Sequence, residues 1–115
     1  MSEAHKSDKL LFSLGLCARA GKLIFGTDMV CDALRKSAKE VKIVIEASDT
    51  SDNTHKKISD KCAYYGARLE RIRQDSLTLG YALGKRRQTA VVAVTDTSLA
   101  SLVLSNLEAA KNIDQ

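Results

Sequence analysis

The sequence of 115 residues contains no proline and no tryptophan, and its aromatic residues are limited to two phenylalanines and three tyrosines. The core must therefore be mainly aliphatic, because a domain of this size buries about two thirds of its unfolded surface. No apolar run approaches the roughly 20 residues that cross a membrane, and no secretory signal pattern opens the chain. The lack of proline and of low-complexity linkers favours one domain, which we place at residues 7–113, after a flexible tail at residues 1–6.

Cysteine is also sparse, with Cys17, Cys31 and Cys62. An odd number of cysteines without Cys-x-x-Cys spacing indicates free thiols in a reducing compartment, so we expect a cytoplasmic protein. Each cysteine falls on the apolar side of an expected helix. This position favours buried, unreactive thiols over a nucleophile.

Residues that could carry catalysis or hold a metal are not arranged for either task. His5 and His55 have no cysteine or carboxylate at ligand spacing, and we expect both to face solvent. Asp49, Asp52 and Asp60 could form an acidic magnesium cluster, but Asp52 fits better as the cap of a helix. No Ser/His/Asp set and no pair of carboxylates in the sequence indicates catalysis. The sequence thus predicts a protein that is not an enzyme and that needs no metal and no cofactor.

Helical and extended patterns alternate along the chain. Apolar residues recur every three or four positions over about 7–20 and again after residue 96, which indicates helices. Two compact β-branched runs, 41–46 and 90–95, indicate strands, and their almost wholly apolar character places them at the centre of a sheet. Weaker patterns add strands at 23–25 and 69–72, and helices capped at Thr27, at Asp52, and at Asp75 or Ser76. The alternation predicts an α/β fold, with a four-stranded mixed sheet and helices on both faces.

Positive charge gathers in three places. The 18 lysines and arginines exceed the 14 acidic residues, so the formal charge is +4 and the isoelectric point is about 9.1. Each cluster alone is typical of a solvated surface, but their recurrence beside loops and helix N-termini favours RNA binding, because free N–H groups there face phosphates. The clusters are Lys85–Arg86–Arg87 before the last strand, Arg19 and Lys22 around the first strand, and Lys56, Lys57 and Lys61 on one face of the third helix.

Several motifs occur in the order and spacing of one known family. They are Leu14–Leu23 (LGLCARAGKL), Gly26, Asn53–Ile58 (NTHKKI), Asp60–Cys62 (DKC), Leu79–Gly84 (LGYALG) and Val91–Asp96 (VVAVTD). With these motifs the chain resembles, over about residues 9–107, the kink-turn-binding ribosomal-protein family of the L7Ae and L30e type, in particular its bacterial YlxQ-like branch. The resemblance implies a three-layer α-β-α sandwich and an RNA-binding face built from three loops, near residues 26–29, 47–49 and 84–87.

The implied loops and the basic clusters together give the candidate RNA-binding residues. Gly26 could serve through a positive φ or a close backbone approach, or it could be an ordinary turn glycine. The candidates are Arg19, Lys22, Gly26, Thr27, Asp28, Met29, Ser48, Lys85, Arg86 and Arg87, with Lys56, Lys57 and Lys61 as an additional basic face.

The first loop departs from the Gly-x-Asn-Glu-x-x-Lys pattern of kink-turn readers. Asp28 stands at the Asn position, Met29 at the Glu position and Asp32 at the Lys position. An ionised Asp only accepts hydrogen bonds, and Met cannot replace Glu as an acceptor. We therefore expect a non-catalytic, monomeric RNA-binding protein with an altered kink-turn motif. It would bind structured RNA, such as ribosomal RNA, around the ribosome, translation or transcription. The alternative is a protein-interaction module that binds a protein partner with the same fold and without specific RNA recognition.

Overall fold

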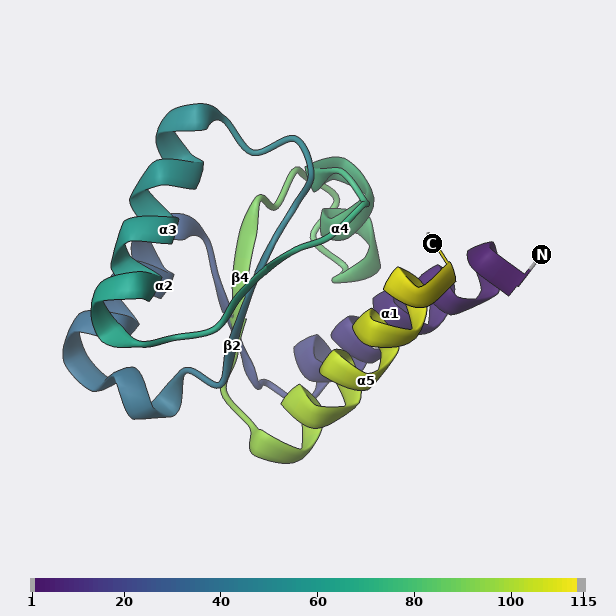
Figure 1. Cartoon of the computed structure of the whole chain (residues 1–115), viewed down its shortest axis with the longest axis horizontal. Coiled ribbons are helices and arrows are strands. Elements are labelled where there is room, and N and C mark those ends of the chain that lie inside the picture. Colours follow the sequence, from purple (N-terminus) through teal and green to yellow (C-terminus); the bar gives the residue numbers. More distant parts are fainter. Residues whose placement is uncertain (1, 114–115) are drawn as a thin grey trace.

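A computed structural model describes the backbone of residues 2–113 and the side chains of residues 9–111. Helices and strands alternate as the sequence predicts (Figure 1). The elements, in chain order, are α1 (Ser2–Arg19), β1 (Leu23–Phe25), α2 (Thr27–Ser37), a 3-10 turn (Ala38–Glu40), β2 (Ile43–Glu46), α3 (Asp52–Tyr65), β3 (Leu69–Arg71), α4 (Ser76–Ala82), β4 (Val91–Val94) and α5 (Thr97–Ile113).

The four strands form one mixed sheet in the order β1-β4-β2-β3. Strand β4 is antiparallel to both β1 and β2, whereas β2 and β3 are parallel. Every residue of β2 and β4 is buried. The prediction that the two apolar runs form the centre of the sheet is confirmed, because only a strand covered on both faces can bury all of its residues.

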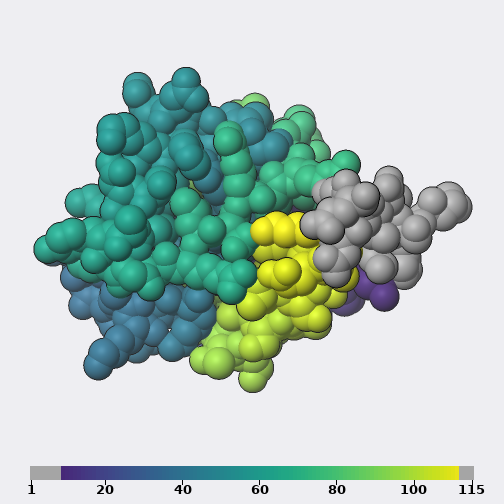
Figure 2. Space-filling view, viewed as in Figure 1, coloured from purple at the N-terminus to yellow at the C-terminus, as the bar shows by residue number. Residues whose placement is uncertain are grey.

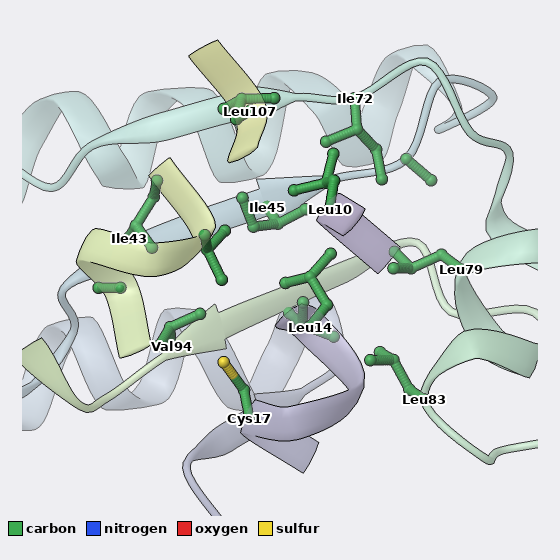
Figure 3. Close-up of a cluster of buried hydrophobic side chains, with 14 residues drawn as sticks. Leu10, Leu14, Cys17, Ile43, Ile45, Ile72, Leu79, Leu83, Val94 and Leu107 are labelled. Atoms are coloured by element: carbon green, nitrogen blue, oxygen red, sulfur yellow. The ribbon is translucent and has the colours of Figure 1, made fainter. Parts of the chain in front are cut away.

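Helices cover both faces of the sheet, which confirms the three-layer α-β-α sandwich (Figure 1). Alternate residues of β2 point to opposite faces, as strand geometry requires. Ile43 and Ile45 pack against α1, α4 and α5, together with Leu14 and Leu107 (Figure 3). Val44 points the other way, into a second core formed with α2 and α3. The core is aliphatic, as the shortage of aromatic residues predicts.

Hydrogen bonds and ion pairs connect the edge strand β3 with α5. The Arg68 guanidinium donates to Glu70 and to Glu108, and Lys111 donates to Glu70 at 2.6 Å. In the space-filling view, the teal surface near β3 meets the yellow surface of α5 at this place (Figure 2). Hydrogen bonds from Lys111 and Arg68 hold the pKa of the half-buried Glu70 carboxyl below its usual range, although burial acts in the opposite direction.

Several helix boundaries differ from their predicted positions. Helix α1 begins at Ser2 rather than near Ser7, and the side chains of the expected tail, residues 1–6, lie outside the described part. The residue before α2 is Gly26, with no side-chain cap, so Thr27 is its first helical residue and not its cap. Ser51 rather than Asp52 caps α3, because the Ser51 hydroxyl accepts the Thr54 N–H at 3.2 Å. Of the two residues predicted as the cap of α4, Asp75 is the one that caps it.

His55 is partly exposed, as expected, but it also has a buried partner that the sequence did not reveal. Its Nδ1–H donates to the Glu46 carboxylate, at 2.7 and 2.9 Å from the two oxygens. Glu46 ends β2 and its side chain is completely buried, while the His55 side chain is 44% exposed. A buried carboxylate needs a hydrogen-bonding partner, and the first turn of α3 provides it.

Candidate nucleic-acid interface

Three loops meet at one end of the sheet. Because β1 and β2 both run antiparallel to β4, their C-terminal ends lie beside the start of β4. The Gly26 N–H donates to the Val91 carbonyl at 2.9 Å, and the Ala47 N–H donates to the Ala90 carbonyl at 2.8 Å. We call this surface the loop edge; it consists of residues 26–29, 47–49 and 84–90.

The N-terminus of α2 is open at the loop edge. Gly26 has φ +93° and ψ 148°, and no side chain caps the helix. A Cβ at Gly26 would meet no atom within 4 Å, so the backbone conformation, and not a close approach, is what requires glycine there. The first-turn N–H groups lack intrahelical acceptors and carry the positive end of the helix dipole. A hollow of about 400 Å³ beside them is lined by Gly26, Thr27, Lys85 and Arg87, among others.

The basic loop, Lys85–Arg87, presents three exposed cations beside this hollow. Two residues in the left-handed region, Gly84 with φ +77° and Arg86 with φ +54°, shape the loop. Arg86 is the single non-glycine residue with positive φ in the described chain, so its backbone is strained. No salt bridge to any of the three cations occurs within the described part of the chain, and Lys85 Nζ instead lies 4.0 Å from the centre of the Phe25 ring.

Gly80 positions the basic loop, and sequence reasoning missed this role. It is a buried helical residue, and a Cβ built on it would overlap the Arg87 carbonyl oxygen and lie 2.9 Å from the Arg87 carbonyl carbon. The Gly80 carbonyl also accepts the Lys85 N–H at 2.9 Å. A glycine inside an otherwise regular helix was the available signal, because glycine there lowers helix stability unless packing requires it.

The loop after β2 is ordered by contacts from other elements. Ser48 is exposed at the loop edge, as expected. The neighbouring Asp49 carboxylate accepts from the Ser76 N–H at 2.8 Å and from its hydroxyl at 3.0 Å. The Arg71 guanidinium donates to the carbonyl oxygens of Ala47, Ser48 and Thr50. Asp49 thus stabilises the start of α4, and the described residues contain no group of three or more acidic, histidine or cysteine side chains that could hold a metal ion.

The acidic residues of the first loop are paired with cations. Asp28 accepts from Lys57 of α3 at 2.6 Å, and this bond raises the pKa of the Lys57 ammonium. Asp32 contacts Arg35 at 2.6 Å and Lys36 at 3.1 Å, and their hydrogen bonds lower the pKa of its carboxyl group. The altered motif is therefore less repulsive to phosphate than its sequence suggests.

Two of the three lysines of the additional basic face on α3 form ion pairs with carboxylates. Lys57 is bound to Asp28, and Lys56 is bound to Asp60 at 3.0 Å. Lys61 is exposed on the same helix. Met29 is 60% exposed, one residue beyond Asp28 on α2.

The structure separates Lys22 from the loop edge. Lys22 precedes β1, and its carbonyl accepts the Thr95 N–H at the far end of β4. Gly26 lies four residues further along an extended segment, roughly 13 Å away. Arg19, by contrast, lines a hollow together with Lys85 and Phe25, on the α1 side of the basic loop. The two residues are close in sequence, but Arg19 lines a hollow with Lys85, whereas Lys22 pairs with Thr95 at the far end of β4.

The prediction of buried thiols is confirmed for two of the three cysteines. Cys17 and Cys62 are buried and Cys31 is half-buried, and all three are free. Burial raises the pKa of each thiol, to about 11 for Cys62. None of them lies among the residues of the loop edge.

Comparison with known proteins shows the family of this chain. A model of the ribosomal protein L7Ae/L30e/S12e/Gadd45 family matches residues 8–103. The chain belongs to this family. Within it, the chain is 38% identical to the RNA-binding protein YlxQ of Bacillus subtilis (strain 168) over 95 residues, which are 83% of this chain and 91% of that protein. It is also 42% identical to the RNA-binding protein YlxQ of Enterococcus faecium over 65 residues, 56% of this chain and 60% of that protein.

Solved structures with the L7Ae-type fold are also similar to this chain. A protein of unknown function from Bacillus halodurans C is 32% identical, with a TM-score of 0.78, over 87% of this chain and 97% of that chain. The Giardia lamblia 15.5kD RNA binding protein shares the fold at 18% identity, with a TM-score of 0.72, over 95% of this chain and 90% of that chain. The resemblance to the L7Ae family and its YlxQ-like branch is confirmed. Across the described residues, no helix is long and apolar enough to cross a membrane.

Proposed function

We propose that this protein is a non-catalytic, cytoplasmic RNA-binding protein that binds structured RNA through its loop edge as a monomer. It forms one domain over residues 7–113 and acts around the ribosome, translation or transcription. The YlxQ relatives and the Giardia protein are named as RNA-binding proteins, which supports this class.

The observation that carries the proposal is the hollow between α2 and the basic loop. Gly26 and Thr27, at the N-terminus of α2 that no side chain caps, line it together with Lys85 and Arg87. Phosphate is the ligand that suits both, because backbone N–H groups bind its oxygens and the cations attract its charge. Phosphate contacts position RNA without reading its sequence.

The altered first loop bears on specificity. Asp28 is occupied by Lys57, and Met29 offers no carboxylate to a guanine edge. We propose that binding is weak and salt-sensitive, with little preference for a kink-turn over a straight duplex.

Replacing the three cations of the basic loop tests the proposed contact. The variant with Lys85→Gln, Arg86→Gln and Arg87→Gln should flatten the slope of log Kd against log salt concentration by about two to three units. Each lost phosphate contact removes roughly 0.7 to 0.9 from that slope. Fluorescence titration of a labelled RNA duplex at several salt concentrations measures it.

A matched control removes three positive charges at the opposite end of the sheet. Lys22→Gln, Lys39→Gln and Lys42→Gln change the net charge equally, but they lie beside the starts of β1 and β2. This control should leave the slope within about one unit of the native value. Equal effects of the two variants would show that net charge, and not the loop edge, governs binding.

Restoring the kink-turn pattern should change selectivity. The variant with Asp28→Asn, Met29→Glu and Asp32→Lys regains an amide, a carboxylate acceptor and a phosphate-binding cation. We expect its affinity ratio for a kinked over a straight duplex of equal length to rise about tenfold, as one good base contact provides. Kink-selective binding by the native protein would contradict the proposed loss of selectivity.

The alternative is a protein-interaction module with the same fold. RNA affinity falls steeply with salt because counterions are released on binding. Salt-insensitive retention of one protein, without retained RNA, would therefore favour the alternative. Crosslinking in cells followed by sequencing of the bound RNA would identify the target.

A further inference from the structure

Two exposed aromatic rings lie on the face where α1 and α4 pack together. Phe12 on α1 is 63% exposed, and Tyr81 on α4 is 60% exposed. The helices approach closely here, since a Cβ at Gly15 would lie 3.1 Å from the Ala82 carbonyl oxygen. Phenylalanine is usually buried, so two such rings on one face of a chain that has only five aromatic residues need an explanation. Neither ring belongs to the loop edge.

Aromatic rings also hold the cations of this face. The Arg19 Cζ atom lies 5.8 Å from the centre of the Phe12 ring, and Lys85 Nζ lies 4.0 Å from the centre of the Phe25 ring. Neither cation forms a salt bridge with another side chain in the described part. A cation–π contact positions a charge without neutralising it, whereas a carboxylate would do both. Both positive charges therefore remain available to an anion.

A hollow of about 480 Å³ lies among these groups, and Phe12 is connected to it through its contact with Arg19. Arg19, Phe25, Tyr81 and Lys85 all line it, and the described residues of its lining include no carboxylate. Phe25 and Lys85 also line the hollow beside α2, so the two hollows share a wall. We call the set Phe12, Arg19, Tyr81 and Lys85 the aromatic–basic face. It continues the loop edge over α1 and α4.

We infer that the aromatic–basic face binds unpaired nucleotides adjoining the structured RNA held at the loop edge. Bases stack on Phe12 and Tyr81, and the phosphates between them lie beside Arg19 and Lys85. Stacking suits every base, so this contact strengthens binding without demanding a sequence. The face combines cations with aromatic rings, and its hollow has no carboxylate. These features suit a single-stranded nucleic acid, which has negative phosphates and flat bases, better than an apolar protein helix. The inference rests on the proposed function and adds single-stranded segments to its ligands.

The test compares RNA probes that differ only in an unpaired tail. A short blunt duplex and the same duplex with a single-stranded uridine tail are titrated with the native protein and with the Phe12→Ala/Tyr81→Ala variant. The tail should raise native affinity at least about fivefold for each stacked base. The variant keeps Arg19 and Lys85, so it should bind the blunt duplex as the native protein does and lose most of the gain from the tail. A Tyr81→Phe variant should keep the part of the affinity gain that Tyr81 contributes, because the aromatic ring that stacks on a base remains.

A matched control is Tyr64→Ala, which removes the 81% exposed tyrosine of α3, a ring that packs edge-on against Tyr65. It should leave the gain from the tail unchanged. Photocrosslinking from 5-iodouridine in the tail should label peptides that contain Phe12 or Tyr81.

Each result separates this inference from the proposed function. If the native protein binds the blunt duplex but gains nothing from the tail, the aromatic–basic face is overturned and the loop edge stands. An equal gain for native protein and double variant, or crosslinks confined to other peptides, would overturn it too. If no RNA binds, the proposed function fails first and this inference with it. Loss of a bound protein, and not of RNA, on replacing the two rings would identify a protein-docking face instead.

Discussion

Gly80→Ala should destabilise the protein by about 2 to 3 kcal/mol, although alanine is the better helix former. Glycine inside a helix is less stable than alanine by roughly 0.5 to 1 kcal/mol. At position 80 that gain is outweighed, because the new Cβ would overlap the Arg87 carbonyl oxygen and lie 3.3 Å from the Thr89 hydroxyl. Relief requires the basic loop to move away from α4. We expect the Tm to fall by roughly 10 °C in a calorimetric scan.

The same change should weaken RNA binding at temperatures where the variant is fully folded. The displaced segment carries Arg87, which lines the hollow beside α2. A titration well below the Tm should show affinity reduced by about fivefold or more, as expected when one charged contact is lost.

Gly15→Ala is the matched control for stability, since it places the same methyl group in the other glycine-containing helix. Its Cβ would lie 3.1 Å from the Ala82 carbonyl oxygen, a contact that a small shift of α4 relieves. We expect a change within about 1 kcal/mol, because the small clash offsets the helix-propensity gain. A Gly80→Ala protein as stable as the native one would mean that the basic loop does not pack on α4 as described.

His55→Ala should lower the free energy of unfolding by about 3 kcal/mol at neutral pH. The change removes the donor from the Glu46 carboxylate, which is completely buried at the end of β2. An unpaired buried charge is far more costly than the missing bond itself. Because the native ring is 44% exposed, water can replace part of the contact, which keeps the loss near the lower end of the range for broken buried pairs. Urea unfolding, extrapolated linearly to water, measures the loss.

A second substitution separates the unpaired charge from simple loss of packing. Glu46→Leu in the His55→Ala background removes the carboxylate and leaves β2 wholly apolar, so it should recover most of the lost stability. His55→Gln is the conservative control, since its amide can donate to Glu46. A double variant no more stable than His55→Ala would show that the carboxylate is not the source of the loss.

The Glu46–His55 pair also connects stability with the loop edge. Glu46 precedes Ala47 and Ser48, and His55 lies in the first turn of α3, so the pair closes the connection between β2 and α3. Amide exchange in residues 47–51 should speed up in His55→Ala more than in the Val91–Val94 strand, because local opening depends on local contacts.

The sequence by itself determined the elements whose patterns are local. The β-branched runs at β2 and β4 show in their composition that both faces of these strands are buried, so their central position followed from the chain alone. The cap of α4 was narrowed to Asp75 or Ser76, because a cap acts within one turn of its helix. The three-layer order and the three loops followed from the family resemblance.

Only the tertiary structure decided which side chains meet across elements. Asp28 and Lys57 are 29 residues apart, and no local pattern predicts that α3 brings a cation to the altered loop. Arg19 and Lys22 are close in sequence, yet Arg19 lines a hollow with Lys85 of the basic loop, whereas the Lys22 carbonyl accepts the Thr95 N–H at the far end of β4. Gly80 faces Arg87, and Glu46 faces His55, because of how α3 and α4 pack on the strands. Local patterns depend on propensity and periodicity, whereas these pairings depend on strand direction and helix packing, which the full fold sets.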